Sequence, residues 1–466
     1  MPAAISLAPL YLFGIGLVAA APLLEALATA PGAREPAQRW ANIAGLFAIG
    51  ILTNYLLVLL LGSLPVALAV GSILAVVGLA LGVRTRIRSR AAERSPGNTS
   101  ESWLWVFALL VATIVFLYAV LILTLPLTHW DARSIWFFQA KIIYFAGALT
   151  SDSPWSTLEF AHGDYPKLLP TLAAQVAAVA GFWNETLPKS ALLALLVPAA
   201  LGAISFANRP VSAAFLIAML FFPTYSVLWN GYADGYLALY SVLCVLALGR
   251  WIEQRNPGDL LLGLAALGIA ASLKNEGLYF LLCAAVGSAI AATTARGNSG
   301  AHTDSRPSGL PAVAWIAAVS LAGPLTWGIT KRAWGLTNDL GLSDETIAII
   351  WGRLSEPDAL TSILNALFQT FELVGAIVPL ALALVAATLF RVRIPTAFWL
   401  AFTTAALYLA GIIGVYLATP YELAWHLETS AGRTVLPIFA IFSGATFLLL
   451  DVIERPAGAA RPGGTE

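Results

Sequence analysis

The sequence predicts an all-α integral membrane protein with many transmembrane helices. Of its 466 residues, 59% are hydrophobic and only 11% are charged, and the mean hydropathy is +0.82. The apolar residues are gathered into long runs, and about 20 consecutive apolar residues are enough for one helix to cross a bilayer. Composition and run length therefore both exclude an ordinary soluble domain.

About thirteen apolar segments are long enough, or nearly so, to cross a membrane. One further segment, residues 168–182, would extend only roughly 22 Å as a helix, less than a hydrocarbon core of about 30 Å. We expect this segment to be re-entrant or to lie at the interface. The predicted crossings lie near residues 5–28, 40–61, 63–83, 103–126, 187–206, 211–229, 233–251, 258–273, 276–294, 311–329, 366–389, 396–417 and 434–452.

The placement of basic residues predicts which side of the membrane each loop faces. The run RTRIRSRAAER, which begins at Arg84, should be cytoplasmic by the positive-inside rule. If residues 168–182 do not cross, most of the 25 lysines and arginines lie in cytoplasmic loops, and if they do cross, this bias is lost. We therefore expect the N-terminus outside, the C-terminus in the cytoplasm, and residues 129–170 outside.

Several function classes are excluded by composition and missing motifs. The formal net charge is zero, which argues against a nucleic-acid partner because such proteins need a basic surface. Cys244 and Cys283 lie inside apolar runs, so no disulfide or zinc framework is expected. No phosphate-binding glycine-rich loop or dinucleotide fingerprint occurs, which argues against chemistry driven by ATP or NAD.

Residues 129–170 lie between two apolar segments and concentrate ionisable and aromatic side chains. Their density of ionisable and aromatic side chains is unusual for a chain with so few charges, and an ordinary solvated loop is the alternative interpretation. The stretch contains Asp131, Arg133, Lys141, His162, Asp164 and Lys167 among Trp130, Trp136, Trp155 and Tyr165.

The first half of this stretch has the spacing of an amphipathic helix. Ile135, Phe138, Ile142 and Phe145 fall on one helical face. We expect a juxtamembrane helix at the bilayer surface, with Asp131 at its N-terminal end, where the helix dipole favours a carboxylate.

Other polar motifs are predicted on the same outer face. Ionisable groups next to apolar runs cost about 2.5–3.5 kcal/mol each on insertion scales, so they usually face a cavity and a partner. The alternative is that each motif caps a helix and its charge reaches water. The motifs are WNGYADGY with Asp234, SLKNEGLY with Lys274 and Glu276, YELAWHLETSAGRTVLP with His426 and Arg433, and the loop 331–363, which we expect to cover an acceptor.

Carboxylates beside arginines and lysines at this face suit one kind of reaction. A carboxylate accepts a proton from an attacking hydroxyl, and cations neutralise the charge of a departing phosphate. Tryptophans such as Trp229 stack on sugars or lie at the head-group level. Since nucleotide sugars are absent outside the cell, a sugar donor at this face would have to be lipid-linked.

The order of five motifs resembles the membrane-embedded glycosyltransferases of the GT-C fold. HWDARSIW, DYPKLLP, WNGYADGYLALY, SLKNEGL and TSAGRTVLP follow one another over roughly residues 103–450. The sequence is most similar to the bacterial branch of protein O-mannosyltransferases and lipid A aminoarabinose transferases. The resemblance implies a GT-C-like bundle and an inverting hexosyl- or pentosyltransferase of the cell envelope. The donor would be a polyprenyl-phosphate sugar, and the acceptor a hydroxyl on a glycan, lipid or protein.

The resemblance also implies roles for individual residues. Asp131 resembles the family's catalytic carboxylate, Asp234 its second acidic position, and Lys167 the basic residue that holds the lipid phosphate. Because Asp131 is followed by Ala132 rather than by a second acidic residue, no cofactor is certain and a divalent metal stays an open alternative. Further candidates for the donor phosphate are Arg133, Lys274 and Arg433, and supporting candidates are His162, Asp164, Tyr165, Glu276 and His426.

Some of these candidates have equally good structural interpretations. His162 and Asp164 are also typical of a capped turn, Lys274 and Glu276 of a mutual ion pair, and Arg433 of an anchor for the last span.

The resemblance divides the chain into three predicted parts. Residues 1–100 form an N-terminal three-span addition with a basic cytoplasmic loop, residues 101–452 the GT-C-like catalytic membrane domain, and residues 453–466 a flexible cytoplasmic tail. Two other classes stay open, a secondary transporter that uses its carboxylates for ions or protons and a non-catalytic scaffold. A transporter's charges should lie near mid-membrane, often in repeated halves, and no internal repeat is visible.

Overall fold

The computed structural model describes residues 2–30, 35–91, 102–149, 162–298, 310–336 and 344–455, and their regular structure is helical. The only β-type pairing among these residues is one isolated bridge between Ser63 and Ala148. Ten of the described helices are long and apolar enough to cross a membrane, or eleven if one bent pair is a single span. The prediction of an all-α, multi-pass membrane protein is confirmed.

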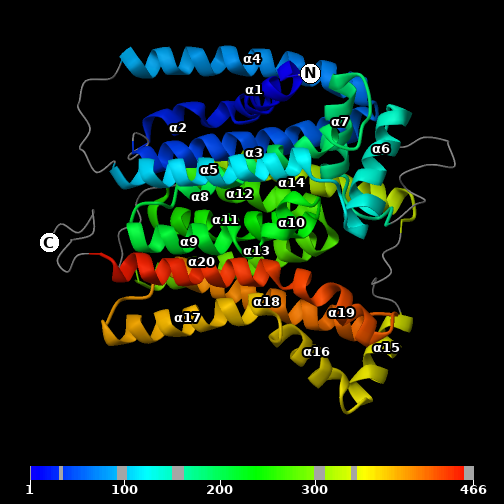
Figure 1. The fold of residues 1–466 in the computed structure, drawn as a ribbon. Helices are drawn as coiled ribbons and strands as arrows, with labels where there is room; N and C mark the ends of the chain where they lie inside the picture. Colours follow the sequence, from blue (N-terminus) through cyan, green and yellow to red (C-terminus); the bar gives the residue numbers. More distant parts are fainter. Residues whose placement is uncertain are drawn as a thin grey trace.

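The helices follow one another along the chain as in Figure 1. They are α1 (Pro2–Ala19), η1 (Ala21–Leu23), α2 (Leu24–Thr29), α3 (Pro36–Leu61), α4 (Leu64–Ala91), α5 (Ser102–Thr124), η2 (Ala132–Trp136), α6 (Phe137–Ala146), α7 (Leu168–Ala180), η3 (Leu187–Ser190), α8 (Ala191–Ile204), α9 (Pro210–Phe221), α10 (Tyr225–Trp229), α11 (Ala233–Gln254), α12 (Pro257–Leu273), α13 (Asn275–Asn298), α14 (Leu310–Ala333), α15 (Asp344–Ser355), α16 (Ala359–Phe368), α17 (Phe371–Leu389), α18 (Thr396–Ala418), α19 (Leu423–Thr434) and α20 (Leu436–Ile453).

The thirteen predicted crossings are not confirmed. The segment 211–229 is divided into α9 and the five-residue α10, because Pro223 has no backbone N–H to donate and its ring clashes with the carbonyl four residues earlier in a helix. The segment 258–273 becomes the 17-residue α12, and the first segment bends by 68° between residues 19 and 21. By contrast, α7 has only 13 residues, which agrees with the expectation that residues 168–182 are too short to cross.

Among the described helices of membrane length, α11 is the most buried and lies in the centre of the bundle. Within the membrane-length windows, 89% of the residues of α11 are buried, against 22% in α4 and in α5. α11 packs against α12, α13, α18 and α20, whereas the exposed apolar side chains of α4 and α5 suit contact with lipid.

Several short helices gather at one end of the bundle, which we call the polar end because the predicted polar motifs lie there. Figure 1 shows α6, α7, α15, α16 and α19 at this end, and the described C-terminal end of α20 at the opposite end. At that opposite end Arg250 donates to Asp259 over 2.8 Å and Arg209 lies 3.4 Å from Asp451. The separation of the polar motifs from these arginines agrees with the sequence-based expectation, while the side of the membrane that each end faces stays a prediction.

The helix predicted after Asp131 is present as η2 and α6. Of the predicted apolar face, Ile135 is buried and Phe145 is 70% exposed, and Trp136, Ala140 and Ile143 are buried as well. Contact of this face with a bilayer surface stays a prediction. The helix begins with the π-helical segment η2, whose wider turn rotates the following side chains relative to a regular helix. The sequence pattern could not reveal this rotation.

The N-terminal helices are packed into the bundle. α3 contacts α8, α12 and α14, and Asn54 and Gln175 of α7 exchange two hydrogen bonds, of 2.7 and 3.1 Å. The Tyr55 hydroxyl also accepts a hydrogen bond of 3.0 Å from the backbone N–H of Lys167. The segment predicted as an N-terminal addition therefore contacts residues beside the candidate site.

Gly78 on α4 allows a close approach of two helices and provides a test of this packing. A Cβ at Gly78 would lie 1.8 Å from the Gly14 carbonyl oxygen of α1, whereas a Cβ at Gly414 of α18 would have nothing within 4 Å. We expect Gly78→Ala to destabilise the protein by about 1–3 kcal/mol through overpacking. Gly414→Ala should be neutral or stabilising, because alanine favours helices. Thermal unfolding of both variants in detergent measures this, and equal unfolding temperatures would contradict the close approach.

Candidate functional site

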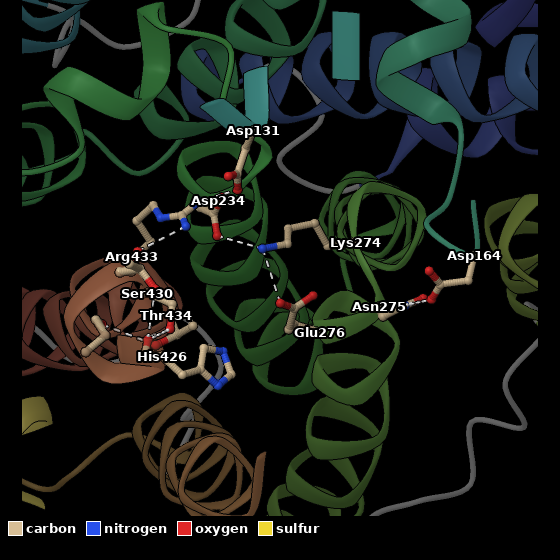
Figure 2. A network of polar contacts seen from close by, with 12 residues as sticks. Asp131, Asp164, Asp234, Lys274, Asn275, Glu276, His426, Ser430, Arg433 and Thr434 are labelled. Carbon is tan, nitrogen blue, oxygen red and sulfur yellow. Dashed lines mark hydrogen bonds and ion pairs between the residues drawn. The ribbon is translucent and has the colours of Figure 1, made fainter. Parts of the chain in front are cut away.

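Five charged side chains from separate parts of the chain meet at the polar end, as Figure 2 shows. Arg433 pairs with Asp131 and lies 3.9 Å from Asp234. Lys274 Nζ lies 2.9 Å from Asp234 Oδ1 and 3.2 Å from Glu276 Oε1. The charges alternate in sign along the order Asp131, Arg433, Asp234, Lys274 and Glu276, which we call the charged network.

Local structure aims these side chains at one another. Asp234 and Glu276 lie in the first turns of α11 and α13, where the helix dipole favours carboxylates. Lys274 is extended, with φ −147° and ψ 165°, so the chain breaks for one residue between α12 and α13. Gly231 has φ 86°, a conformation that glycine adopts readily and that turns the chain toward α11.

Burial divides the charged network into an inner pair and an outer part. The side chains of Asp234 and Lys274 are only 5% and 8% exposed, whereas those of Asp131, Arg433 and Glu276 are 20–24% exposed. Burial alone would lower the pKa of Lys274, but Asp234 and Glu276 raise it well above its usual value. The inner pair is thus shielded from solvent, whereas the outer groups are partly accessible to it.

Aromatic rings border the charged network. The Tyr232 ring lies 4.7 Å from the Arg433 guanidinium carbon, and the Tyr165 ring lies 6.0 Å from Lys274 Nζ. Tyr165 in turn is stacked between Trp136, at 5.6 Å, and His162, at 4.8 Å. Burial raises the pKa of Tyr165, so this hydroxyl stays neutral.

A second polar cluster lies on the other side of the break between α12 and α13. The side-chain amide of Asn275 donates to Asp164 Oδ2 over 2.5 Å. Lys331 Nζ lies 3.5 Å from Asp164 Oδ2 and 3.4 Å from the side-chain Oδ1 of Asn275. Trp327 Nε1 donates to the Asp164 backbone carbonyl over 3.2 Å. Figure 2 shows Asn275 pointing toward Asp164 while Lys274 points toward Asp234, so the two clusters meet at consecutive residues.

Lys167 belongs to the side of the second cluster. Its side chain is fully buried, its Nζ donates to Gln139 over 3.0 Å, and the ammonium lies 5.4 Å above the Trp327 ring. Burial lowers the pKa of Lys167 to about 7. A phosphate would therefore reach Lys167 only after neighbouring side chains had moved.

The structure thus brings together some of the predicted residues and separates others. Asp131, Asp234, Lys274, Glu276 and Arg433 meet in the charged network. His426 lies seven residues before Arg433 on α19, which places both on one helical face.

The remaining predicted residues lie elsewhere. Arg133 is exposed, and Lys141 pairs with Glu185 over 2.8 Å. Trp130 is 64% exposed, and Trp155 lies outside the described residues.

Sequence reasoning did not select several residues that shape the site. Two of them, Gln139 and Tyr55, contact Lys167. A third, Lys331, was expected in a loop but lies in the last turn of α14. The only feature of the sequence that could have indicated Gln139 is a polar glutamine among apolar residues of a predicted helix. Tyr55 had none, because it lies in an unremarkable apolar run.

The described residues contain no group of three or more His, Cys, Asp or Glu side chains arranged to hold a metal ion. A divalent metal stays the alternative that the sequence analysis left open.

An apolar cavity lies beside α7, away from the charged network. It has a volume of about 550 Å³ and lies between α1, α3, α4, α7 and α8. Among its lining residues are Leu12, Phe47, Leu172, Val176 and Leu193, with Gln175 as a polar contribution.

The chain matches no known family model, no curated protein and no solved structure. A function can therefore be proposed only from the residues and the geometry of the site.

The buried pair of Asp234 and Lys274 predicts strong energetic coupling. Removing one partner of a buried ion pair costs about 3–5 kcal/mol, because the other charge is left uncompensated. We expect Asp234→Asn and Lys274→Met each to lower the unfolding temperature, and the double variant to lose clearly less than the sum. The exposed pair of Lys141 and Glu185 is the control, with coupling of about 0–1 kcal/mol. Additive effects at Asp234 and Lys274 would contradict the pairing.

The lowered pKa of Lys167 predicts a pH-dependent contribution to stability. In the unfolded chain the lysine is protonated up to about pH 10.4, whereas in the folded protein it loses its proton near pH 7. Folding therefore carries the full cost of burying the ammonium below pH 7, and this cost declines as the pH rises. We expect Lys167→Met to have a more favourable effect on the unfolding temperature at pH 6 than at pH 9, by a few degrees. The control Lys141→Met should show no such difference, and an equal effect of Lys167→Met at both pH values would refute the assignment.

Proposed function

We propose that this protein is a membrane glycosyltransferase. It would move a sugar from a polyprenyl-phosphate donor to an acceptor hydroxyl at the extracytoplasmic face. The observation that carries the proposal is the pairing of Asp131 with Arg433 at the partly exposed edge of the charged network. A carboxylate and a guanidinium in contact provide the base and the phosphate ligand that such a transfer needs.

In the proposed reaction, the acceptor oxygen attacks the anomeric carbon of the donor sugar. The hydroxyl proton passes to the Asp131 carboxylate, and the bond between the anomeric carbon and the phosphate oxygen breaks. The leaving group is polyprenyl phosphate, whose added negative charge Arg433 stabilises. Attack from the side opposite the leaving group inverts the anomeric centre.

In this mechanism Arg433 binds two anions in turn, first Asp131 and then the donor phosphate. Without substrate it neutralises Asp131 and lies 3.9 Å from Asp234. A donor phosphate would compete for the guanidinium, since Arg binds phosphate in a planar, bidentate manner. Asp131 would then be released to accept a proton, while the buried pair of Asp234 and Lys274 keeps its geometry.

A lipid-linked donor suits the surroundings of the site. The charged network lies at the ends of apolar helices, so a phosphate there would lie at head-group depth with its chain among apolar surfaces. The apolar cavity beside α7 is one such surface. The extracytoplasmic side follows from the positive-inside rule alone.

Replacement of Asp131 tests the proposal. With a panel of polyprenyl-phosphate sugars carrying mannose, glucose, galactose, arabinose or aminoarabinose, the wild type in nanodiscs should transfer or slowly hydrolyse one donor. Asp131→Asn should lower this rate at least 100-fold, the lower range of a general base's contribution, without a fall in unfolding temperature. Glu185→Gln, an exposed carboxylate at the same end, should behave like the wild type. Equal rates in Asp131→Asn and wild type would refute the role of Asp131.

One observation favours a transporter as the second candidate. Charges of alternating sign at the end of a helical bundle, such as Asp234, Lys274 and Glu276, are also typical of proton or ion pathways. Their position at one end of the bundle rather than at its middle is less usual for a transporter. Proton or ion flux into liposomes that is lost in Asp234→Asn, without any turnover of the donor panel, would favour this second function.

A further inference from the structure

A second pocket at the polar end lies between α15 and the start of α19. It has a volume of about 500 Å³ and is lined by Ile349, Gly352, Arg353, Glu356, Glu422, Leu423 and Ala424. Three of these residues are charged, and none belongs to the charged network. We call this space the α15–α19 pocket.

Arg353 holds the wall of this pocket in place. Its Nη2 donates to the backbone carbonyls of Thr419, over 2.9 Å, and Tyr421, over 2.7 Å. These bonds tie α15 to the segment between α18 and α19. Within the described part of the chain, Arg353 Nε is buried without a hydrogen-bond partner. A buried polar group in that state costs about 1–3 kcal/mol.

His426 connects the α15–α19 pocket to the charged network. Its ring packs against Tyr416 at 5.0 Å and Tyr421 at 6.0 Å, and its Nδ1 is buried without a hydrogen-bond partner in the described chain. Two helical turns further along the same face of α19 is Arg433, and Figure 2 shows His426 and Arg433 at the edge of one polar region.

The side chains of the pocket suit the hydroxyls of a sugar. The carboxylates of Glu356 and Glu422 accept hydrogen bonds, and Arg353 donates them, so both kinds of partner that a sugar hydroxyl needs are present. The exposed rings of Tyr421 and Trp425 lie 5.7 Å apart beside these residues and offer apolar faces for sugar C–H groups. A phosphate or other anionic head group would be repelled by the two carboxylates.

The distance along α19 indicates how long the ligand must be. Ten residues separate Leu423, in the pocket, from Arg433, which corresponds to roughly 15 Å of helix. A short oligosaccharide spans such a distance, whereas a single sugar does not.

We propose that the α15–α19 pocket binds the far end of an oligosaccharide acceptor and so presents its terminal hydroxyl to Asp131. This inference rests on the proposed function and narrows the acceptor from glycan, lipid or protein to glycan. Glu356 and Glu422 are acceptor-binding residues in this arrangement, and Arg353 is a positioning residue.

The test compares acceptors of different length in full-length protein in nanodiscs. The donor is the polyprenyl-phosphate sugar that the wild type hydrolyses, and the acceptors are fluorescently labelled mono-, di- and trisaccharides of glucose, mannose and galactose. We expect at least one trisaccharide to be used at least 10-fold more efficiently than the corresponding monosaccharide. The double variant Glu356→Gln/Glu422→Gln should raise the KM for that trisaccharide at least 10-fold, with a change in kcat of less than threefold.

The control is Glu428→Gln, an exposed glutamate on the same helix but outside the pocket, which should keep the wild-type KM. An unchanged KM in the double variant would overturn the inference. So would Asp131-dependent hydrolysis of the donor without transfer to any saccharide, although the proposed function would then still stand. Absence of Asp131-dependent hydrolysis would overturn the proposed function and this inference together.

Discussion

The buried ion pair between Asp234 and Lys274 is the interaction on which the polar end of the molecule depends. Two charges at the ends of apolar helices are tolerated only when each compensates the other, because removing either leaves a charge without solvent. The pair joins α11, the most buried of the described membrane-length helices, to the break between α12 and α13. Arg433 lies beside Asp234, and Glu276 beside Lys274. The same buried pair therefore helps to fix the positions of both α13 and α19.

The one-residue break at Lys274 separates two kinds of polar surroundings. Lys274 contacts Asp234 and Glu276, while Asn275 contacts Asp164 and Lys331. A continuous helix would direct consecutive side chains about 100° apart around one axis, whereas here α13 begins anew after an extended residue. The break thus brings a partly exposed reactive region and a buried supporting cluster within two residues of each other.

The proposed function assigns distinct tasks to these regions. Asp131 and Arg433, at the accessible edge, contact the reacting groups, and Asp234 with Lys274 holds them in position. His426 and the α15–α19 pocket extend the same face of α19 toward an acceptor. Lys167, which resembles the phosphate-binding lysine of the GT-C family, is instead buried beside Gln139, so the cation best placed for a phosphate is Arg433, whose side chain is 24% exposed.

The sequence by itself determined the all-helical membrane class and the gathering of polar motifs at one end, because hydropathy and charge order record how deep each residue lies. It did not determine the number of spans, since Pro223 interrupts the helix within residues 211–229 and the first apolar segment bends by 68° after Ala19. Nor did it determine which charges meet: Arg133 is near Asp131 in sequence but is exposed, and the partner is Arg433, 302 residues away. Local patterns specify helices and burial, whereas contacts between distant side chains depend on how the helices rotate and pack. That information exists only in the tertiary structure.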